Sequence, residues 1–240
     1  MTTLTTIGFW PWPVKSIGPG QPPGGTIDPP FADVSLLLGF DGSFADESSY
    51  NHTPTATSAS ISTTTVKYGT GSGSFPSDGS IVTYPDDDSF WFDADFTMEC
   101  WVYPNSLAKT RRVLQQATTG QFSFFSNLNT DGTVSLTLSS DGTSFSTLAT
   151  VQTVTTGQWQ HLAWTRAGST VRAFIDGQLD SQTLTFAGAL HNSTAPVYVG
   201  GNTAAQGNGL NGFLDEVRIT KGVALYTQSF TPPSSKFPRS

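Results

Sequence analysis

The feature that most constrains the fold is the segment 159–177, which reads Trp-Gln-His-Leu-Ala-Trp-Thr-Arg-Ala-Gly-Ser-Thr-Val-Arg-Ala-Phe-Ile-Asp-Gly. Two short runs rich in β-branched and aromatic residues flank an Ala-Gly-Ser break, as in two strands joined by a tight turn. The final Asp-Gly pair is the one that a second tight hairpin favours, because both central positions of that turn need a positive φ. The segment therefore predicts two antiparallel strands that lead into a third over residues 178–186.

Similar runs of strand length recur along the chain, and turn residues separate them. The predicted strands are 34–40, 61–68 (with weaker alternation), 81–84, 96–103, 111–117, 121–127, 133–139, 145–154, 196–201 and 212–219. Asp-Gly pairs punctuate the chain, beginning at Asp41, Asp78, Asp131, Asp141 and Asp176. Within 96–103, alternation places four apolar side chains on one face, which we expect to be core: Phe96, Met98, Cys100 and Val102.

The polar residues are the kind that suits strands and turns. Charged residues make up only 12 % of the chain, and Thr, Ser and Gly fill most polar positions. Thr is stiff at χ1 and Gly weakens a helix interior, so we expect very little helix. At 240 residues the chain is long enough for one sizeable all-β domain. The fold class predicted is an antiparallel β-sandwich built from two sheets.

The first 32 residues differ from the rest and are predicted to form an extended arm, followed by one domain over 33–240. Seven prolines stand among many glycines in 1–30, and so many prolines favour extended backbone over a packed core. Three aromatic residues lie near the start of the arm: Phe9, Trp10 and Trp12. One interpretation is a disordered linker. The other is an assembly anchor, in which the three rings are buried on a partner, as aromatic side chains often are at interfaces.

Charge and hydropathy exclude several classes of partner. The net charge is −7 with only 11 Lys and Arg, so the chain lacks the clustered cations with which proteins track nucleic acid. No run of about 18 apolar residues occurs, so we expect no membrane insertion. The N-terminus lacks the charged-then-apolar order of a secretory signal, so a protein acting outside a cell would leave by lysis or within a particle. Cys100 is the only cysteine and cannot form an intrachain disulfide.

Several motifs resemble those of laminin-G-like, concanavalin A-like jelly rolls. They are Trp-x-His-Leu-Ala-Trp-Thr-Arg followed by Val-Arg-Ala-Phe-Ile-Asp-Gly, a Phe-Asp-Gly at 40–42 with an Asp-x-Ser loop, and the closing strand Leu-Asp-Glu-Val-Arg-Ile at 214–219. The C-terminal Gly-Val-Ala-Leu-Tyr-Thr and Phe-Thr-Pro-Pro resemble the ends of such modules in phage structural proteins. The resemblance covers about 33–238 and implies a two-sheet jelly roll with a lectin-like surface.

Catalysis is not expected. The glucanases of this family carry Glu-x-Asp-x-x-Glu on one strand, and the chain has no such pattern among its three glutamates, Glu47, Glu99 and Glu216. Strand alternation predicts that Asp215 and Glu216 point to opposite faces and cannot act as the pair of carboxylates that flanks a sugar. His161 lies within an alternating strand and is predicted to be structural. No zinc spacing is possible with one cysteine, so no cofactor is required.

Two sets of binding residues are candidates. The resemblance implies that Asp41, Asp46 and Asp215 lie where such modules sometimes hold calcium, an ion that prefers oxygen ligands. The alternative is that Asp41 and Asp46 make turns to backbone amides without an ion. For sugar stacking, Tyr50, Trp91 and Tyr198 are candidates by chemical type alone, because the binding loops of such sandwiches vary.

The resemblance and the arm together predict a non-enzymatic virion structural protein of a phage. In this interpretation the jelly roll is displayed on the exterior of the particle, as a tail adhesin or fibre or as a capsid decoration, and binds host-surface glycans. The arm would bind other virion proteins, and we expect a homo-oligomer. The alternatives are a cellular carbohydrate-binding module separated from its enzyme and, on weaker grounds, a glycosidase.

Overall fold

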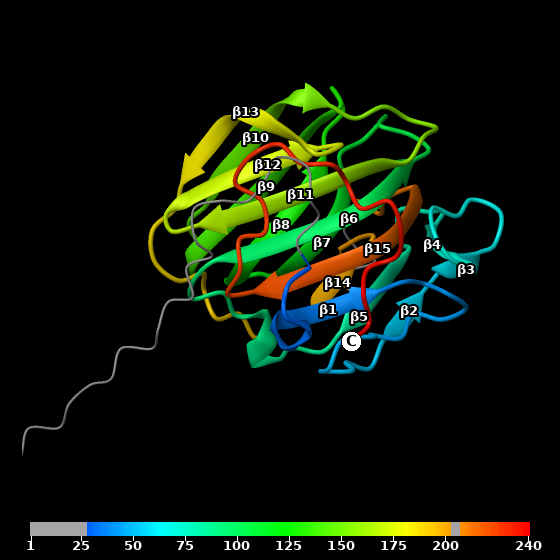
Figure 1. Ribbon diagram of the computed structural model, residues 1–240, viewed down its shortest axis with the longest axis horizontal. Helices are drawn as coiled ribbons and strands as arrows, with labels where there is room; N and C mark the ends of the chain where they lie inside the picture. The colour runs from blue at the N-terminus through cyan, green and yellow to red at the C-terminus, as the bar shows by residue number, and fades with distance from the viewer. Residues whose placement is uncertain (1–27, 203–206) are drawn as a thin grey trace, which may run out of the picture.

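A computed structural model of the protein describes residues 28–202 and 207–240. The predicted anchor residues Phe9, Trp10 and Trp12 therefore lie outside the described residues. The described chain folds into two antiparallel sheets that face each other (Figure 1). Its helical content is two short 3₁₀ helices, η1 (Phe31–Asp33) and η2 (Asp88–Phe90). No helix in this part of the chain is long and apolar enough to cross a membrane.

The larger sheet has eight strands and contains the hairpin predicted within segment 159–177. Its order is β13 (Gln178–Thr185), β12 (Thr170–Ile175), β11 (Gln160–Ala167), β6 (Phe96–Pro104), β15 (Gly212–Lys221), β4 (Ser72–Phe75) and β3 (Ser60–Ser62), with β1 (Val34–Leu38) also paired to β15. The smaller sheet has seven strands. Its order is β10 (Ser146–Thr153), β9 (Thr133–Gly142), β8 (Gln121–Leu128), β7 (Arg111–Thr118), β14 (Val197–Val199), β5 (Ile81–Tyr84) and β2 (Thr55–Thr57).

The predicted hairpins are confirmed. β11 pairs with β12, and β12 pairs with β13, all antiparallel. In the turn between β12 and β13, Asp176 has φ 49° and Gly177 has φ 74°, the positive values that the Asp-Gly pair predicts. A Cβ at Gly177 would lie 2.0 Å from the carbonyl oxygen of Phe230, so this glycine also permits the close approach of the C-terminal chain.

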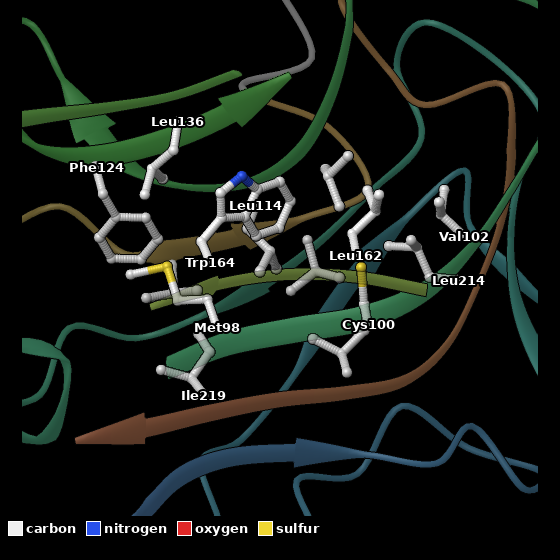
Figure 2. Packing of buried hydrophobic residues seen from close by; sticks show 14 of the residues in the cluster. Met98, Cys100, Val102, Leu114, Phe124, Leu136, Leu162, Trp164, Leu214 and Ile219 are labelled. Atoms are coloured by element: carbon white, nitrogen blue, oxygen red, sulfur yellow. The ribbon is translucent and has the colours of Figure 1, made fainter. Parts of the chain in front are cut away.

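The core lies between the two sheets and has the composition that alternation predicts. Phe96, Met98, Cys100 and Val102 are each fully buried and belong to the central cluster. Figure 2 shows Met98 and Cys100 among side chains from both sheets: Leu162 and Trp164 come from the neighbouring strand of the same sheet, and Leu114, Phe124 and Leu136 come from the other sheet. Burial raises the pKa of the Cys100 thiol, which keeps it protonated, as expected for a small core residue.

One predicted strand is much shorter in the structure. The expected strand 61–68 is reduced to β3, because the backbone N–H groups of Lys67 and Tyr68 donate to the Asp215 carboxylate instead of to a strand. The domain also makes contacts before its predicted start at residue 33. Asp28 pairs with Arg218 at 3.1 Å, and Phe31 packs beside Val34.

The C-terminal segment 222–240 covers the outer face of the eight-stranded sheet. Figure 1 shows this segment, in red, running across the strands of that sheet. Leu225, Tyr226 and Phe230 pack on Ala163 and Phe174. Farther along, Phe237 packs on the outer side chains of β1 and on Phe31. The outer face of the seven-stranded sheet differs, because exposed apolar side chains remain on or beside it, Phe145 at 53 % and Val151 at 61 % exposure.

Candidate binding surface

A row of outward-facing side chains crosses the seven-stranded sheet. In each strand the neighbouring residues, such as Val82, Val199 and Phe124, enter the core, so strand alternation turns the intervening ones outward. The register then aligns these outward residues across six strands: Thr83, Tyr198, Gln115, Phe125, Thr137 and Thr147. The accessible part of this row is Thr83, Phe125 and Thr147, because Gln115, Thr137 and Tyr198 are buried.

Three phenylalanine rings form an aromatic platform beside this row. Phe122 and Phe125 lie on β8, and Phe145 lies just before β10. The ring centroids of Phe122 and Phe145 are 4.9 Å apart, and those of Phe125 and Phe145 are 6.1 Å apart, in edge-to-face arrangements. Such mutual contacts hold the rings in place although Phe145 is more than half exposed. The aromatic platform, Phe122, Phe125 and Phe145, is thus a rigid apolar surface open to a ligand.

Arg112 lies at the edge of the platform and has no acidic partner. Its guanidinium carbon is 4.1 Å from the centroid of the Phe125 ring, a cation–π contact. Burial lowers the pKa of Arg112 to about 10. Within the described chain its side chain makes no hydrogen bond or ion pair, and Nε and Nη1 are both buried. Asn127, opposite Arg112 in the register, likewise has a buried Oδ1 without a partner.

These groups suit a ligand with apolar faces and polar edges. An apolar patch that remains exposed on a folded domain often marks an interaction site. Sugars present C–H faces that can lie on aromatic rings and hydroxyl groups that can reach the surrounding amides and hydroxyls. The arrangement can therefore bind and orient a saccharide.

Comparison with known proteins identifies the family. A model of the concanavalin A-like lectin/glucanases superfamily matches residues 76–226, which is more than half of the chain. The chain belongs to this superfamily. The laminin-G-like, concanavalin A-like resemblance that the motifs indicate is therefore confirmed. No curated protein matches the chain.

Solved structures show where else this superfamily fold occurs. The binding domain of Paraclostridial Mosquitocidal Protein 1 is similar with a TM-score of 0.63 and 16 % identity, over 81 % of this chain and 50 % of that one. The botulinum neurotoxin serotype D ligand binding domain, in complex with N-acetylneuraminic acid, has a TM-score of 0.61 and 13 % identity over 81 % and 49 %. The serotype G binding domain gives 0.61 and 12 % over 80 % and 49 %. At these identities the likeness shows a shared fold, and this chain spans about half the length of each neighbour.

The predicted sugar-stacking residues are not brought together. Tyr50 is exposed but stacks on His52 in the loop before β2. The Trp91 indole N–H donates to the carbonyl oxygen of Leu190 at 3.0 Å, at the end of η2. Tyr198 alone lies in the outward-facing row, at 8 % exposure. The three do not form one platform, and whether any of them contacts a sugar stays a prediction.

The three predicted metal ligands serve separate networks. Asp46 accepts hydrogen bonds from the N–H groups of Leu37, Ser48 and His52, at 2.9 to 3.0 Å, and from the His52 ring at 2.6 Å. Although burial opposes its charge, these bonds, led by the one from the His52 ring, lower its pKa. Burial also opposes the charge of Asp41, but hydrogen bonds from Lys236 and Thr70 lower its pKa to about 2.

Asp215 differs from the other two aspartates. Burial raises its pKa to about 7, although the N–H groups of Tyr68 and Lys67 donate to it at 3.0 Å. Among the residues that the structure describes, no three His, Cys, Asp or Glu side chains gather as a metal site. The structure therefore does not bring Asp41, Asp46 and Asp215 together as one ligand set. Asp46 accepts from the amide of Ser48 two residues on, as in the predicted local turn, whereas Asp41 accepts from the amides of Thr70 and Gly71, 29 and 30 residues away in the sequence. Calcium binding at any single aspartate stays a prediction, which melting temperatures with calcium and with a chelator would test.

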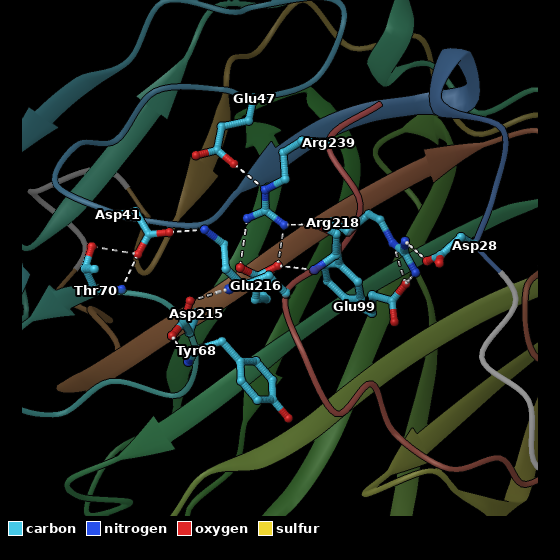
Figure 3. Close-up of polar contacts among 12 residues, drawn as sticks. Asp28, Asp41, Glu47, Tyr68, Thr70, Glu99, Asp215, Glu216, Arg218 and Arg239 are labelled. Carbon is cyan, nitrogen blue, oxygen red and sulfur yellow. Dashed lines mark hydrogen bonds and ion pairs between the residues drawn. The ribbon is translucent and has the colours of Figure 1, made fainter.

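Glu47 and Glu216 lie in ion pairs with the C-terminal segment (Figure 3). Both carboxylate oxygens of Glu216 accept hydrogen bonds from Arg239 at 2.8 Å, and Arg239 also pairs with Glu47 at 2.6 Å. The predicted alternation at 215–216 is wrong, because a register shift interrupts β15 and Glu216 has φ 46°. The carboxylates of Asp215 and Glu216 nevertheless both accept hydrogen bonds from neighbouring groups, so neither is placed as a free acid or base.

Proposed function

We propose that the chain is a non-enzymatic glycan-binding protein whose aromatic platform contacts the sugar. The observation that carries this proposal is the outer face of the seven-stranded sheet, where the exposed Phe145 ring and the half-buried Phe122 and Phe125 rings lie beside a polar row. Membership of a lectin-containing superfamily supports the same conclusion. So does the structural neighbour whose crystals contain N-acetylneuraminic acid, since a receptor-binding protein uses a similar fold.

Replacing Phe145 by alanine should weaken glycan binding without unfolding the protein. Its ring is 53 % exposed, so we expect the free energy of unfolding to change by no more than about 0.5 kcal/mol. Loss of one stacking ring should weaken the affinity about tenfold, equivalent to about 1.4 kcal/mol. The measurement is a glycan array followed by isothermal titration of the best-bound glycan. Val151→Ala, which removes another exposed apolar side chain from the same sheet, is the matched control.

Two outcomes would contradict this proposal. One is a protein that binds no glycan on the array above the level of the heat-denatured chain. The other is a Phe145→Ala variant that binds the same glycan as tightly as the parent, which would move the site away from the aromatic platform.

We further propose that the protein acts on the exterior of a phage virion, as a tail adhesin or fibre or as a capsid decoration. The C-terminal motifs that resemble phage structural modules support this location. So does the aromatic, proline-rich segment at the N-terminus, which can attach to other virion proteins through Phe9, Trp10 and Trp12. In this proposal the jelly roll binds the host surface, and copies of the chain associate with one another.

Removing residues 1–27 should separate folding from assembly. The shortened chain keeps Asp28, whose carboxylate pairs with Arg218, so we expect it to fold and melt like the parent. It should fail to enter particles, because the three rings that we assign to the anchor are missing. Immunoblots of purified particles and sedimentation of the free protein would measure incorporation and oligomeric state. Normal incorporation would favour the rival interpretation, a cellular carbohydrate-binding module, which needs no anchor.

A further inference from the structure

Arg112 is the one arginine of the described chain whose side chain makes no hydrogen bond, since Arg166 and Arg172, which also lack an ion pair, donate to the carbonyl oxygens of Gly188 and Thr170. Arg218 pairs with Glu99 at 2.7 Å, and Arg239 pairs with Glu216 at 2.8 Å. Arg111, the immediate neighbour of Arg112, pairs with Asp78 at 2.5 Å. The described residues provide no such partner for Arg112, although its Nε and Nη1 are buried. A buried guanidinium normally has a hydrogen-bonding partner of opposite charge.

The surroundings of Arg112 decide from which direction a partner can come. The Phe125 ring lies 4.1 Å from its guanidinium carbon and covers one face of the group. A partner must therefore approach in the guanidinium plane, where the N–H groups point. The remaining nitrogen, Nη2, is not buried and is the one that a ligand reaches first. It forms a two-point edge with Nε on one side and with Nη1 on the other, so a ligand that binds at two points must also uncover one of these buried atoms. A planar carboxylate matches such an edge with two parallel hydrogen bonds.

A second unpartnered atom belongs to the residue that faces Arg112 on the next strand. Asn127 is opposite Arg112 on β8, and its Oδ1 is buried without a donor. The Arg112 guanidinium and the Asn127 Oδ1 together suit a ligand that has an anionic group and a nearby hydrogen-bond donor, such as a hydroxyl. Acidic sugars carry both on one ring, and the aromatic platform next to Arg112 can take the apolar face of that ring.

The charge of the surface limits how many anionic groups one sugar can present. The strands of the seven-stranded sheet contain two cationic residues, Arg111 and Arg112, and Arg111 is already paired. The protein as a whole carries a net charge of −7, which disfavours densely charged polyanions. The surface is thus suited to one carboxylate at a time.

We propose that the aromatic surface selects carboxylate-bearing glycans, with Arg112 pairing with the carboxylate and Asn127 accepting a hydrogen bond from a neighbouring hydroxyl. This inference rests on the glycan-binding function proposed above. It adds the class of sugar and the two residues that distinguish an acidic sugar from a neutral one.

The test is an array of sialylated, uronic acid-containing, sulfated and neutral oligosaccharides of matched length. We expect the carboxylate-bearing members to bind best. The best of them should bind about 10- to 100-fold more tightly than its carboxyl-reduced, neutral counterpart, the range expected for hydrogen bonds to a charged group. In Arg112→Gln this preference should vanish while the neutral counterpart binds as before. Arg112→Lys keeps the charge but loses the two-point edge, and should retain only a small part of the preference.

The control is Arg172→Gln, which makes the same change of charge on β12 in the other sheet and should leave the preference intact. Melting curves would show that each variant is folded, and Arg112→Lys remains informative if Arg112→Gln is not. A parent that prefers neutral or sulfated glycans, or an Arg112 variant with an unchanged preference, would overturn the inference and leave glycan binding in place. A parent that binds no member of the array would overturn both.

Discussion

Replacing Glu99 by leucine should lower the free energy of unfolding by about 3 to 5 kcal/mol, the range for removing one partner of a buried ion pair. Glu99 is fully buried on β6, and its Oε1 accepts a hydrogen bond from Arg218 Nε at 2.9 Å and lies 2.7 Å from Arg218 Nη2. Its Oε2 accepts a hydrogen bond from the Tyr226 hydroxyl at 2.9 Å. Leucine would leave the Arg218 charge buried with only the half-exposed Asp28 beside it.

The ionised form of Glu99 is the one that stabilises the fold. Burial would raise its pKa, but the charge of Arg218, together with His161, outweighs burial and lowers the pKa to about 2 from an ordinary 4.5. A carboxyl whose pKa is lower in the folded state contributes fully above the unfolded pKa. Its contribution is lost as the pH falls. The parent should therefore lose stability between about pH 4.5 and 2, and Glu99→Leu should lose less over that range.

Urea denaturation of three variants would measure these effects. Glu99→Leu combined with Arg218→Leu should recover much of the loss, because removing both charges leaves neither one buried alone. Glu47→Leu is the control, since Glu47 pairs with Arg239 where both side chains are partly exposed. It should cost no more than about 1 kcal/mol. A Glu99→Leu variant that is as stable as the Glu47 control would show that the buried pair contributes little.

The strands could be predicted because the residue patterns that indicate them lie within each short segment of the sequence. Alternation in 96–103 identified the inward face of β6, and the Asp-Gly pair at 176–177 identified a turn whose two positive φ values the structure confirms. The strand predicted over 61–68 is mostly absent, for a reason that local alternation of residues cannot reveal. Its amides are bound by Asp215, which is about 150 residues away in the sequence.

The binding surface could not be predicted, because it depends on which face of which sheet stays uncovered. Phe124 and Phe125 are adjacent in the sequence, and alternation sends one inward and one outward without saying whether the outer face is open. The C-terminal segment 222–240 covers the outer face of the eight-stranded sheet, and this becomes visible only in the folded chain. That Arg112 lacks an acidic partner is likewise a property of the assembled sheet, since Arg111 beside it has one. The one feature of the sequence that could have indicated the binding surface was the pair of neighbouring phenylalanines in this strand.

Ending the chain after Lys221, where β15 ends, should prevent the domain from folding. The truncation removes four side chains that are no more than 8 % exposed: Leu225, Tyr226, Phe230 and Phe237. At about 1.5 to 3 kcal/mol for each, their burial contributes roughly 6 to 12 kcal/mol. That range is comparable to the whole stability of a typical domain, about 5 to 15 kcal/mol. The truncation also removes Arg239 from Glu216, which leaves a buried carboxylate without its partner.

A milder variant tests the same segment in a protein that still folds. Phe230→Ala removes a ring that stacks on Tyr226 at 3.5 Å between centroids and contacts Phe174 at 5.4 Å, and it should cost about 3 to 5 kcal/mol. Gln228→Ala changes an exposed residue of the same segment and should be neutral. Urea midpoints compare the two variants, and circular dichroism with limited proteolysis follows the truncated chain. If the truncated chain keeps a cooperative transition near that of the parent, the segment is an appendage. If it does not, the jelly roll requires segment 222–240 as a third layer over its eight-stranded sheet, which leaves the seven-stranded sheet as the face available for ligands.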